Sequence, residues 1–372
     1  MNNIAAVHAS RVARAFAALA AAAFLAGCGG SGSDNGTSSS TENVQAPAKS
    51  DFPSAQGKTL ADVLNSTSGP SQLVVSPTQE VFYKGENRYG FGVFNLDHSQ
   101  VADAEVALYF AKVPAGEETT LPKNAGKLGK SGTGGTQTTP PPKKSVAQAL
   151  DQPAVGPFPA AIETLETKPA FRAQTTANDP DAATAVYVTH VDFPSDGEWR
   201  IAAVIKEGDK LTATLMPSAV VGQVNGIPRV GQRPPRIHTP TPETVGGDPS
   251  KLTTRVPPET MNQVDFFDAL GKKPIVLLFA TPQFCQSRVC GPVVDIAEQL
   301  REQYRDQVDF IHMEIYNDND PGKGVRPQVR AFNLPSEPWL FVIDRRGIVS
   351  TVIEGAFDVT ELEDAIKKVA GG

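Results

Sequence analysis

The alternation of hydrophobic and polar residues predicts β-strands along residues 71–221. Apolar residues recur at every second position in several short stretches, and Val106, Leu108 and Phe110 share one face of such a strand. Residues 207–210, Glu-Gly-Asp-Lys, separate two further apolar stretches and have the composition of a hairpin turn. No stretch of this part repeats its apolar residues as a helix of three turns would. We therefore predict an all-β domain of two packed sheets over residues 71–221.

A different pattern begins near residue 259, where predicted strands and helices alternate. Residues 274–280 form a continuous apolar run, which is typical of a strand buried on both faces. Residues 291–304 follow with an apolar stripe at helical spacing, and residues 360–363 have the capping-box pattern that starts the last helix. The predicted order is β-α-β-α-β-β-α after a short helix. This order indicates an α/β domain over residues 259–370, so the chain has a mixed fold class.

Three further segments have the composition of linkers. Residues 28–70 begin with a stretch rich in Gly, Ser and Thr and are expected to form a flexible tether. Residues 116–145 are rich in Gly, Pro, Thr and Lys, which predicts a disordered insertion in the β domain. Residues 222–258 are Pro-rich and are expected to connect the two domains.

Composition limits the function classes. The chain has 372 residues, a net charge of −7 and a hydrophobic content of 40%, which suffices for two domains with real cores. Nucleic acid is not expected as a partner, because phosphate binding needs a basic surface. No Gly-rich phosphate loop and no Ser/His/Asp order stands out in the sequence, and no cofactor is expected.

The N-terminal residues resemble a bacterial lipoprotein signal. Two arginines precede an apolar run over residues 15–26 that is too short to span a bilayer, and residues 25–28 read Leu-Ala-Gly-Cys. The resemblance implies a lipoprotein signal peptide over residues 1–27, cleavage before Cys28, lipidation of that cysteine, and a mature chain anchored to a membrane on its extracytoplasmic side. An ordinary signal peptide with an incidental cysteine is the alternative. With Cys28 assigned to lipid, Cys285 and Cys290 remain as a pair in an oxidising or redox-managed compartment.

The spacing of Cys285 and Cys290 limits the structure around them. Residues five apart in a regular helix have Cα atoms roughly 8–9 Å apart, whereas a disulfide needs less than about 7 Å. Cys285 is therefore expected in the loop before the helix, unless the first helical turn unwinds. The pair could serve as a redox site, as a metal site or as a structural disulfide.

The C-terminal domain resembles the thioredoxin fold, with its cysteines where the first strand meets its helix. Residues 279–281, Phe-Ala-Thr, and then Phe-Cys at 284–285 are similar to the active-site approach of membrane-anchored thiol-disulfide oxidoreductases of the cytochrome-maturation type. Pro338 and the strand after it are similar to the cis-proline and following strand of those enzymes. The resemblance implies catalytic roles for Cys285, Cys290 and Pro338, a cis Glu337–Pro338 bond close to Cys285, and an unidentified protein thiol or disulfide as partner.

The expected fold class of the whole chain combines these interpretations. The short alternating strands of residues 71–221 favour an immunoglobulin-like β-sandwich. The C-terminal part, residues 259–370, is expected to be an α/β thioredoxin-like domain.

Three other functions stay open. Q-type peroxiredoxins also place four residues between their cysteines, but they have Thr or Ser three residues before the attacking cysteine, where this chain has Pro282. Sco-type copper proteins combine two cysteines with a histidine, and His312, the only histidine after the pair, is a candidate ligand. His312 falls inside a predicted strand, so a packed side chain is the competing interpretation. A binding lipoprotein with a structural disulfide is the third possibility.

Within the pair, Cys285 is predicted to attack and Cys290 to resolve. Cys285 is expected at the start of a helix, where free N–H groups favour a thiolate, and Arg288 could add positive charge. Cys290 is expected more than one turn inside that helix and less exposed than Cys285.

Overall fold

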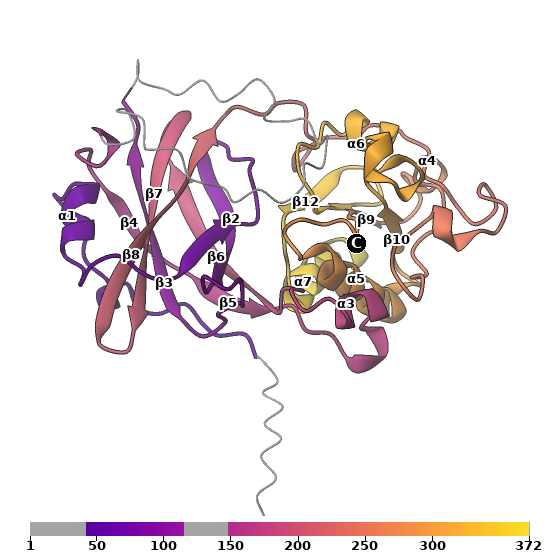
Figure 1. Ribbon diagram of the computed structural model, residues 1–372. Helices are drawn as coiled ribbons and strands as arrows, with labels where there is room; N and C mark the ends of the chain where they lie inside the picture. Colours follow the sequence, from indigo (N-terminus) through magenta and orange to yellow (C-terminus); the bar gives the residue numbers. More distant parts are fainter. Residues whose placement is uncertain (1–41, 115–147, 372) are drawn as a thin grey trace, which may run out of the picture. The chain divides into compact units, whose positions relative to one another are not determined.

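The computed structural model describes residues 42–114 and 148–371 (Figure 1). The predicted signal peptide with Cys28 and the predicted insertion at 116–145 lie outside the described residues. Within the described ranges, no helix is long and apolar enough to cross a membrane. This part of the chain is β-rich and contains three four-stranded sheets.

Two antiparallel sheets make up the N-terminal β region, residues 42–114 and 148–221. The first has the strand order β1-β2-β6-β5 and the second β4-β3-β7-β8. The predicted hairpin joins β7 to β8, with Gly208 at a φ of 62° in its turn. The strands are β1 (Val74–Pro77), β2 (Gly85–Phe94), β3 (Glu105–Lys112), β4 (Val155–Pro159), β5 (Ala161–Thr164), β6 (Ala185–Phe193), β7 (Gly197–Glu207) and β8 (Lys210–Val221).

The two sheets face each other across one hydrophobic core. Val106, Leu108 and Phe110 of β3 all belong to this core, as the alternation of the sequence predicted. The rings of Tyr89 and Phe193 contact Phe110 edge-to-face, with ring centroids 5.8 Å and 5.2 Å away. Such aromatic pairs contribute about 0.5–1.5 kcal/mol each beyond the area that they bury.

The opposite face of β3 is also buried, which the alternation did not predict. Tyr109 is 0% exposed and packs in a second core with Leu60 and Val63 of helix α1 (Leu60–Asn65). Thr59 begins this helix with a capping box, and the short helix η1 (Lys49–Asp51) precedes it. Residues 42–70 therefore pack against the sheet, and the prediction of a free tether is wrong for this part of residues 28–70.

The C-terminal α/β region, residues 259–371, is built on one mixed sheet of order β10-β9-β11-β12. β9 and β10 run parallel, whereas β11 is antiparallel to both β9 and β12. The predicted order of strands and helices is therefore confirmed. The strands are β9 (Ile275–Phe279), β10 (Asp309–Met313), β11 (Trp339–Ile343) and β12 (Val349–Glu354), and the helices are α4 (Phe266–Ala269), α5 (Cys290–Tyr304), η4 (Asn317–Asn319), η5 (Pro321–Lys323), α6 (Pro327–Ala331) and α7 (Val359–Ala370).

Strand β9 is buried on both faces, as its continuous apolar run predicted. Val276 and Leu278 belong to the core that includes side chains of α5 and α7, whereas Leu277 belongs to the core on the other face. Helix α7 begins two residues earlier than predicted. Its N-cap is Asp358, whose carboxylate accepts from a backbone N–H in the first turn, so the predicted cap at Thr360 is wrong.

Two connections leave their own sheet and pack elsewhere. In the Pro-rich connector, which contains η3 (Pro249–Lys251), Gly231 and Gln232 form backbone hydrogen bonds with Val349 of β12 at 2.8 Å and 2.9 Å. The link between β5 and β6 contains η2 (Pro169–Phe171) and α3 (Gln174–Ala177). Figure 1 shows α3 beside α5, and a hydrogen bond from Ala173 to Asp295 joins the two segments.

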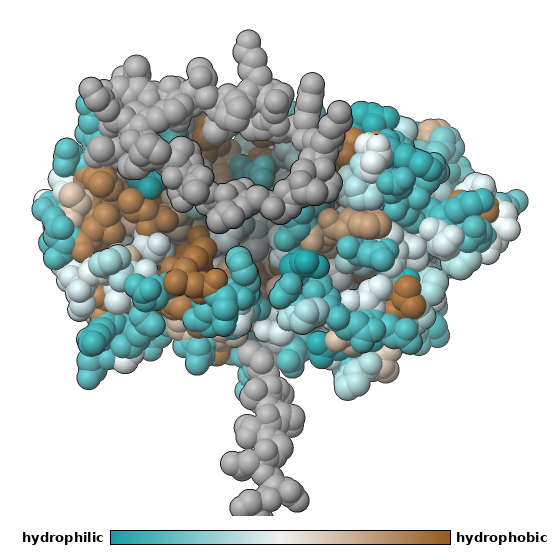
Figure 2. Space-filling model, in the orientation of Figure 1, coloured by the Kyte–Doolittle hydropathy of each residue, from teal (hydrophilic) through white to brown (hydrophobic). Residues whose placement is uncertain are grey.

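Apolar residues also reach the surface of the N-terminal β region. Figure 2 shows them as brown groups at the left of the view. Val74 of β1 and Leu215 of β8 are 45% and 40% exposed. Scattered exposed apolar residues are normal on folded proteins, so they do not define a site by themselves.

Candidate functional site

Cys285 and Cys290 form a disulfide with their Cα atoms 5.9 Å apart. Cys285 lies in the loop between β9 and α5, and Cys290 is the first residue of α5. Arg288, between them, has a φ of 61°, a left-handed conformation that turns the loop back toward the helix. The prediction that Cys285 precedes the helix is therefore confirmed, and the turn brings the two Cα atoms within disulfide range.

The sulfur of Cys285 lies at the N-terminus of α5. The backbone N–H of Cys290 donates a hydrogen bond to Sγ of Cys285 at 3.3 Å, and Ser287 Oγ lies 3.3 Å from the same sulfur. The first N–H groups of a helix have no partner inside the helix and lie at the positive end of its dipole. Once the disulfide is reduced, this position favours the thiolate of Cys285. The expected placement was wrong in one respect, because Cys290 rather than Cys285 begins the helix.

The two cysteines differ slightly in burial. Cys285 is 5% exposed and Cys290 is 0% exposed, which agrees with the predicted order. Both belong to the core under α5, and that core also contains Ala183 and Val186 from the link before β6 and from β6 itself. The small exposed part of the pair therefore belongs to Cys285.

Pro338 lies at the end of the sheet from which the cysteine loop leaves. The Glu337–Pro338 bond is cis, as the resemblance implied. Trp339 of β11 pairs with Phe279 of β9 across antiparallel strands. Pro338 precedes Trp339 and Ala280 follows Phe279, so both residues lie at the same end of the sheet. Contact between Pro338 and Cys285 stays a prediction.

His312 is a buried ion-pair partner. Its Nδ1 lies 2.7 Å from Glu259 Oε1 and its Nε2 lies 3.1 Å from the carbonyl oxygen of Ala280, and the side chains of His312 and Glu259 are both 0% exposed. Both partner atoms are acceptors, so both ring nitrogens carry protons. Burial alone would lower the pKa of His312, but the Glu259 carboxylate raises it overall. With both nitrogens bonded, His312 packs inside the fold and offers no free nitrogen to a metal.

Glu314, two residues further along the chain, is a second buried acid beside the cysteine loop. Burial raises its pKa, and the nearby His312 offsets part of this shift. Its Oε1 accepts from Thr254 N and Thr254 Oγ1, each at 2.7 Å. Thr254 Oγ1 in turn accepts from the backbone N–H of Gln283 at 3.1 Å. Together with the bond from His312 to Ala280, this network holds the loop that leads to Cys285.

The sequence interpretation missed the partners in this network. Glu259 and Thr254 lie in or beside the connector, far along the chain from the cysteines. A signal existed in the strand itself, because His312 and Glu314 alternate with apolar residues in Phe-Ile-His-Met-Glu-Ile and therefore share one face. Charged groups on a fully buried strand must be paired, so that face predicts buried partners.

One acidic cluster in the described residues has the spacing of a metal site. Oxygen atoms of Glu163, Asp358 and Glu361 lie within 4.8 Å of one another. Arg88 occupies this cluster, with Nε 2.7 Å from Glu361 Oε1 and Nη2 3.5 Å from Glu163 Oε2. Burial raises the pKa of Glu163 to about 7, and Arg88 counteracts that shift. The guanidinium already supplies the positive charge, so the cluster is an ion-pair network.

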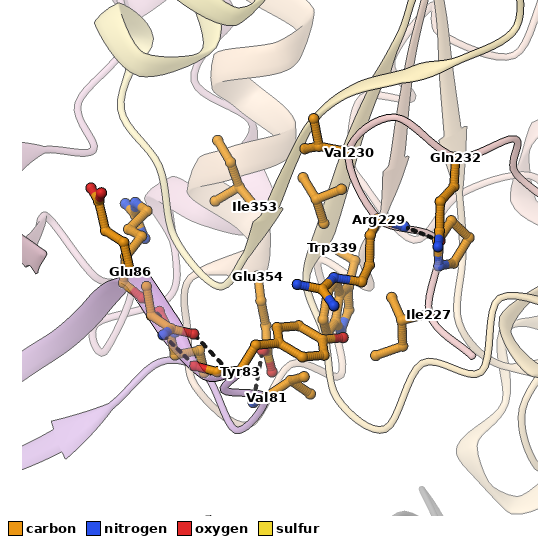
Figure 3. Close-up of a pocket in the computed structure, with 15 residues that line it drawn as sticks. Val81, Tyr83, Glu86, Ile227, Arg229, Val230, Gln232, Trp339, Ile353 and Glu354 are labelled. Carbon is orange, nitrogen blue, oxygen red and sulfur yellow. Dashed lines mark hydrogen bonds between the residues drawn. The ribbon is translucent and has the colours of Figure 1, made fainter. Parts of the chain in front are cut away.

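A cavity of about 490 Å³ opens elsewhere on the protein (Figure 3). The guanidinium of Arg229 lies over the ring of Tyr83, 4.1 Å from its centroid. Glu354 accepts from the backbone N–H of Glu80 at 2.8 Å and from that of Val81 at 3.0 Å. No residue of the cysteine loop lines this cavity.

Comparisons with known proteins give no family. No family model matches the sequence, and no curated protein matches it. Among solved structures, the chain is similar to one described as the thiol:disulfide interchange protein DsbE of Chlorobium tepidum, with 16% identity and a TM-score of 0.27 over 38% of this chain and 97% of that chain. It is also similar to a DUF4784 family protein of Bacteroides caccae, with 9% identity and a TM-score of 0.18 over 42% of this chain and 26% of that chain. Scores this low carry no argument about fold or function.

Proposed function

We propose that the C-terminal α/β region is a thioredoxin-like domain that exchanges thiols and disulfides with a partner protein through Cys285 and Cys290. The observation that carries the proposal is the hydrogen bond from the N–H of Cys290 to the sulfur of Cys285 at the start of α5. A reactive cysteine gains a stabilised thiolate at a helix N-terminus. The order β9-α5-β10 followed by the antiparallel β11 and β12 supports the same class.

The exchange balances as two successive thiolate attacks. A partner thiolate attacks Sγ of Cys285, the bond to Cys290 breaks, and Cys290 leaves as a thiolate that takes up a proton. A second thiolate of the partner attacks the partner's sulfur in the mixed disulfide, and Cys285 leaves and takes up a proton in turn. The partner ends as a disulfide, and the domain ends as a dithiol with two more electrons and two more protons. The reverse sequence, started by the thiolate of Cys285, reduces a partner disulfide.

The rest of the chain suggests where this chemistry takes place. We propose that Cys28 carries lipid and anchors the chain to a membrane, with both structured regions on the extracytoplasmic side. The lipoprotein-type sequence at residues 25–28 supports this location. The two facing antiparallel sheets of the N-terminal β region support an immunoglobulin-like sandwich placed between the anchor and the redox domain.

The reduction potential of the Cys285–Cys290 pair tests the proposed function. The folded chain is equilibrated in glutathione buffers of graded ratio, and free thiols are alkylated and counted by mass spectrometry. A potential between about −270 and −120 mV is expected, the range of thiol-disulfide exchange proteins. A potential below about −300 mV identifies a structural disulfide and overturns the proposal.

A further inference from the structure

The link between β5 and β6, residues 168–183, packs against the α/β region although it belongs to the N-terminal β region by sequence. Lys168 N donates to Gln299 Oε1 at 2.8 Å, and Ala173 N donates to Asp295 Oδ2 at 3.1 Å. Both acceptors lie on α5, the helix that begins with Cys290. The link therefore runs along the helix that carries half of the disulfide.

The middle of the link is held by a buried charge pair. Asp295 and Arg255 lie 2.8 Å apart, and their side chains are 1% and 5% exposed. Arg255 also donates from Nη2 to the carbonyl oxygen of Phe171 at 2.6 Å. A buried pair of this kind is costly to break, because each charge would remain in a low dielectric without its partner. Residues 171–173 are thus the firmly held part of the link.

The end of the link nearest the cysteines is held more weakly. Ala183 N donates to the carbonyl oxygen of Arg288 at 3.1 Å. The side chain of Arg288 pairs with Asp179 at 3.1 Å and with Asp181 at 3.9 Å, and it is 47% exposed. Exposed ion pairs contribute little to stability. We therefore expect this end to open at a lower cost than residues 171–173.

The link also approaches the cysteine helix closely. A Cβ placed on Gly291, the residue after Cys290, would lie 2.9 Å from Thr176 Oγ1 of α3. Ala183 shares the hydrophobic core of Cys285 and Cys290. Residues from outside the α/β region therefore contribute to the core that contains Cys285.

We propose that residues 168–183 form an autoinhibitory strap over the Cys285–Cys290 disulfide, which a partner protein displaces at the Arg288 end to reach Cys285. The inference rests on the proposed exchange function. The strap acts in two ways. It adds Ala183 to the core that contains both cysteines, and its Asp179 and Asp181 neutralise Arg288, the nearest cation in sequence that could stabilise a thiolate at Cys285.

The test compares a bulky and a small reductant on the full folded chain. Rates of disulfide reduction are measured with purified reduced thioredoxin and with dithiothreitol. The rate with thioredoxin divided by the rate with dithiothreitol reports how accessible the disulfide is to a protein. Asp179→Asn removes the charge that pairs with Arg288, and the exposed Asp306→Asn is the matched control. The ratio should rise in Asp179→Asn by up to about fivefold, the upper limit for one exposed ion pair, and it should not change in Asp306→Asn.

A second pair of variants tests the same strap by size instead of charge. Gly291→Ala places a methyl group against Thr176 and should raise the ratio. The added change Thr176→Ala in the same chain removes the colliding hydroxyl and should return the ratio to its wild-type value. Ratios that stay at the wild-type value in both Asp179→Asn and Gly291→Ala overturn the strap but leave the exchange function standing, provided that thioredoxin reduces the wild type. If neither reductant reduces any folded variant, the exchange function itself fails and the strap fails with it.

Discussion

The sulfur of Cys285 accepts a hydrogen bond from the backbone N–H of Cys290, 3.3 Å away, although the two side chains are already joined by a disulfide. The bond makes the two cysteines chemically unequal. Cys285 lies where the helix N-terminus favours negative charge, whereas Cys290 is 0% exposed. Attack by Cys285 and resolution by Cys290 stay a prediction, which this inequality favours.

Removal of the resolving cysteine should trap the partner. In Cys290→Ser the mixed disulfide on Cys285 has no internal thiol to release it. Expressed in a bacterial envelope, this variant should accumulate a covalent complex on non-reducing gels that dithiothreitol dissolves. Cys285→Ser, which loses the same disulfide, is the matched control and should form no such complex. If both variants only melt at a lower temperature and trap nothing, the pair is a structural disulfide.

Glu337, the residue before Pro338, should make stability depend on pH. Burial, and then the nearby Glu80, raise its pKa to about 7. The folded protein thus binds this proton more tightly than the unfolded chain does, so stability is lost as the pH rises from about 4.5 to about 7. Glu337→Gln should be more stable than the wild type at pH 8 by on the order of 1–2 kcal/mol, with little difference at pH 4.5.

Urea unfolding at both pH values checks the prediction for Glu337. The exposed Glu166→Gln is the matched control, since it removes the same charge from a solvated position. Equal stabilisation by Glu337→Gln at pH 4.5 and pH 8 would contradict a raised pKa of Glu337, because an effect of packing alone does not depend on the protonation of this side chain.

The buried pair of His312 and Glu259 should be strongly coupled. His312→Asn leaves the Glu259 carboxylate buried without its partner, which typically costs about 3–5 kcal/mol. The double variant with Glu259→Gln should lose less than the sum of the two single changes. The attraction to Glu259 raises the pKa of His312, so the advantage of the wild type over His312→Asn should shrink as the pH rises through that folded value. A cycle of denaturation midpoints measures the coupling, and additive losses would contradict it.

Cys28 should decide whether the chain stays with membranes. If Cys28 carries the lipid, Cys28→Ser removes the anchor and should move the chain from the membrane pellet to the supernatant after expression in a bacterial host. Fractionation with an antibody against the α/β region measures the distribution. A Cys28→Ser chain that stays in the pellet at the wild-type level would exclude lipid on this cysteine as the anchor.

Local patterns in the sequence determined most of the elements. The apolar run at 274–280 predicted β9 because a strand between two layers meets apolar neighbours on both faces. The stripe at 291–304 predicted α5 because side chains three and four residues apart share one face of a helix. The spacing of the cysteines also placed Cys285 outside the helix, since backbone dimensions alone exclude a disulfide across five helical residues.

Only the tertiary structure decided which polar groups and which faces would be buried together. Tyr109 is buried on the outer face of its sheet because residues 42–70 pack there. No local pattern in β3 predicts that an earlier segment of the chain covers this face. The side chain of Arg88 bonds to that of Glu361, 273 positions further along the chain. His312 likewise bonds to Glu259, which is 53 positions away. Residues 168–183 have no unusual composition, yet Lys168 and Ala173 bond to side chains of α5, the helix that begins with Cys290. Such pairings follow from burial, because a buried charge is stable only beside its opposite, and the fold alone determines which opposite lies within reach.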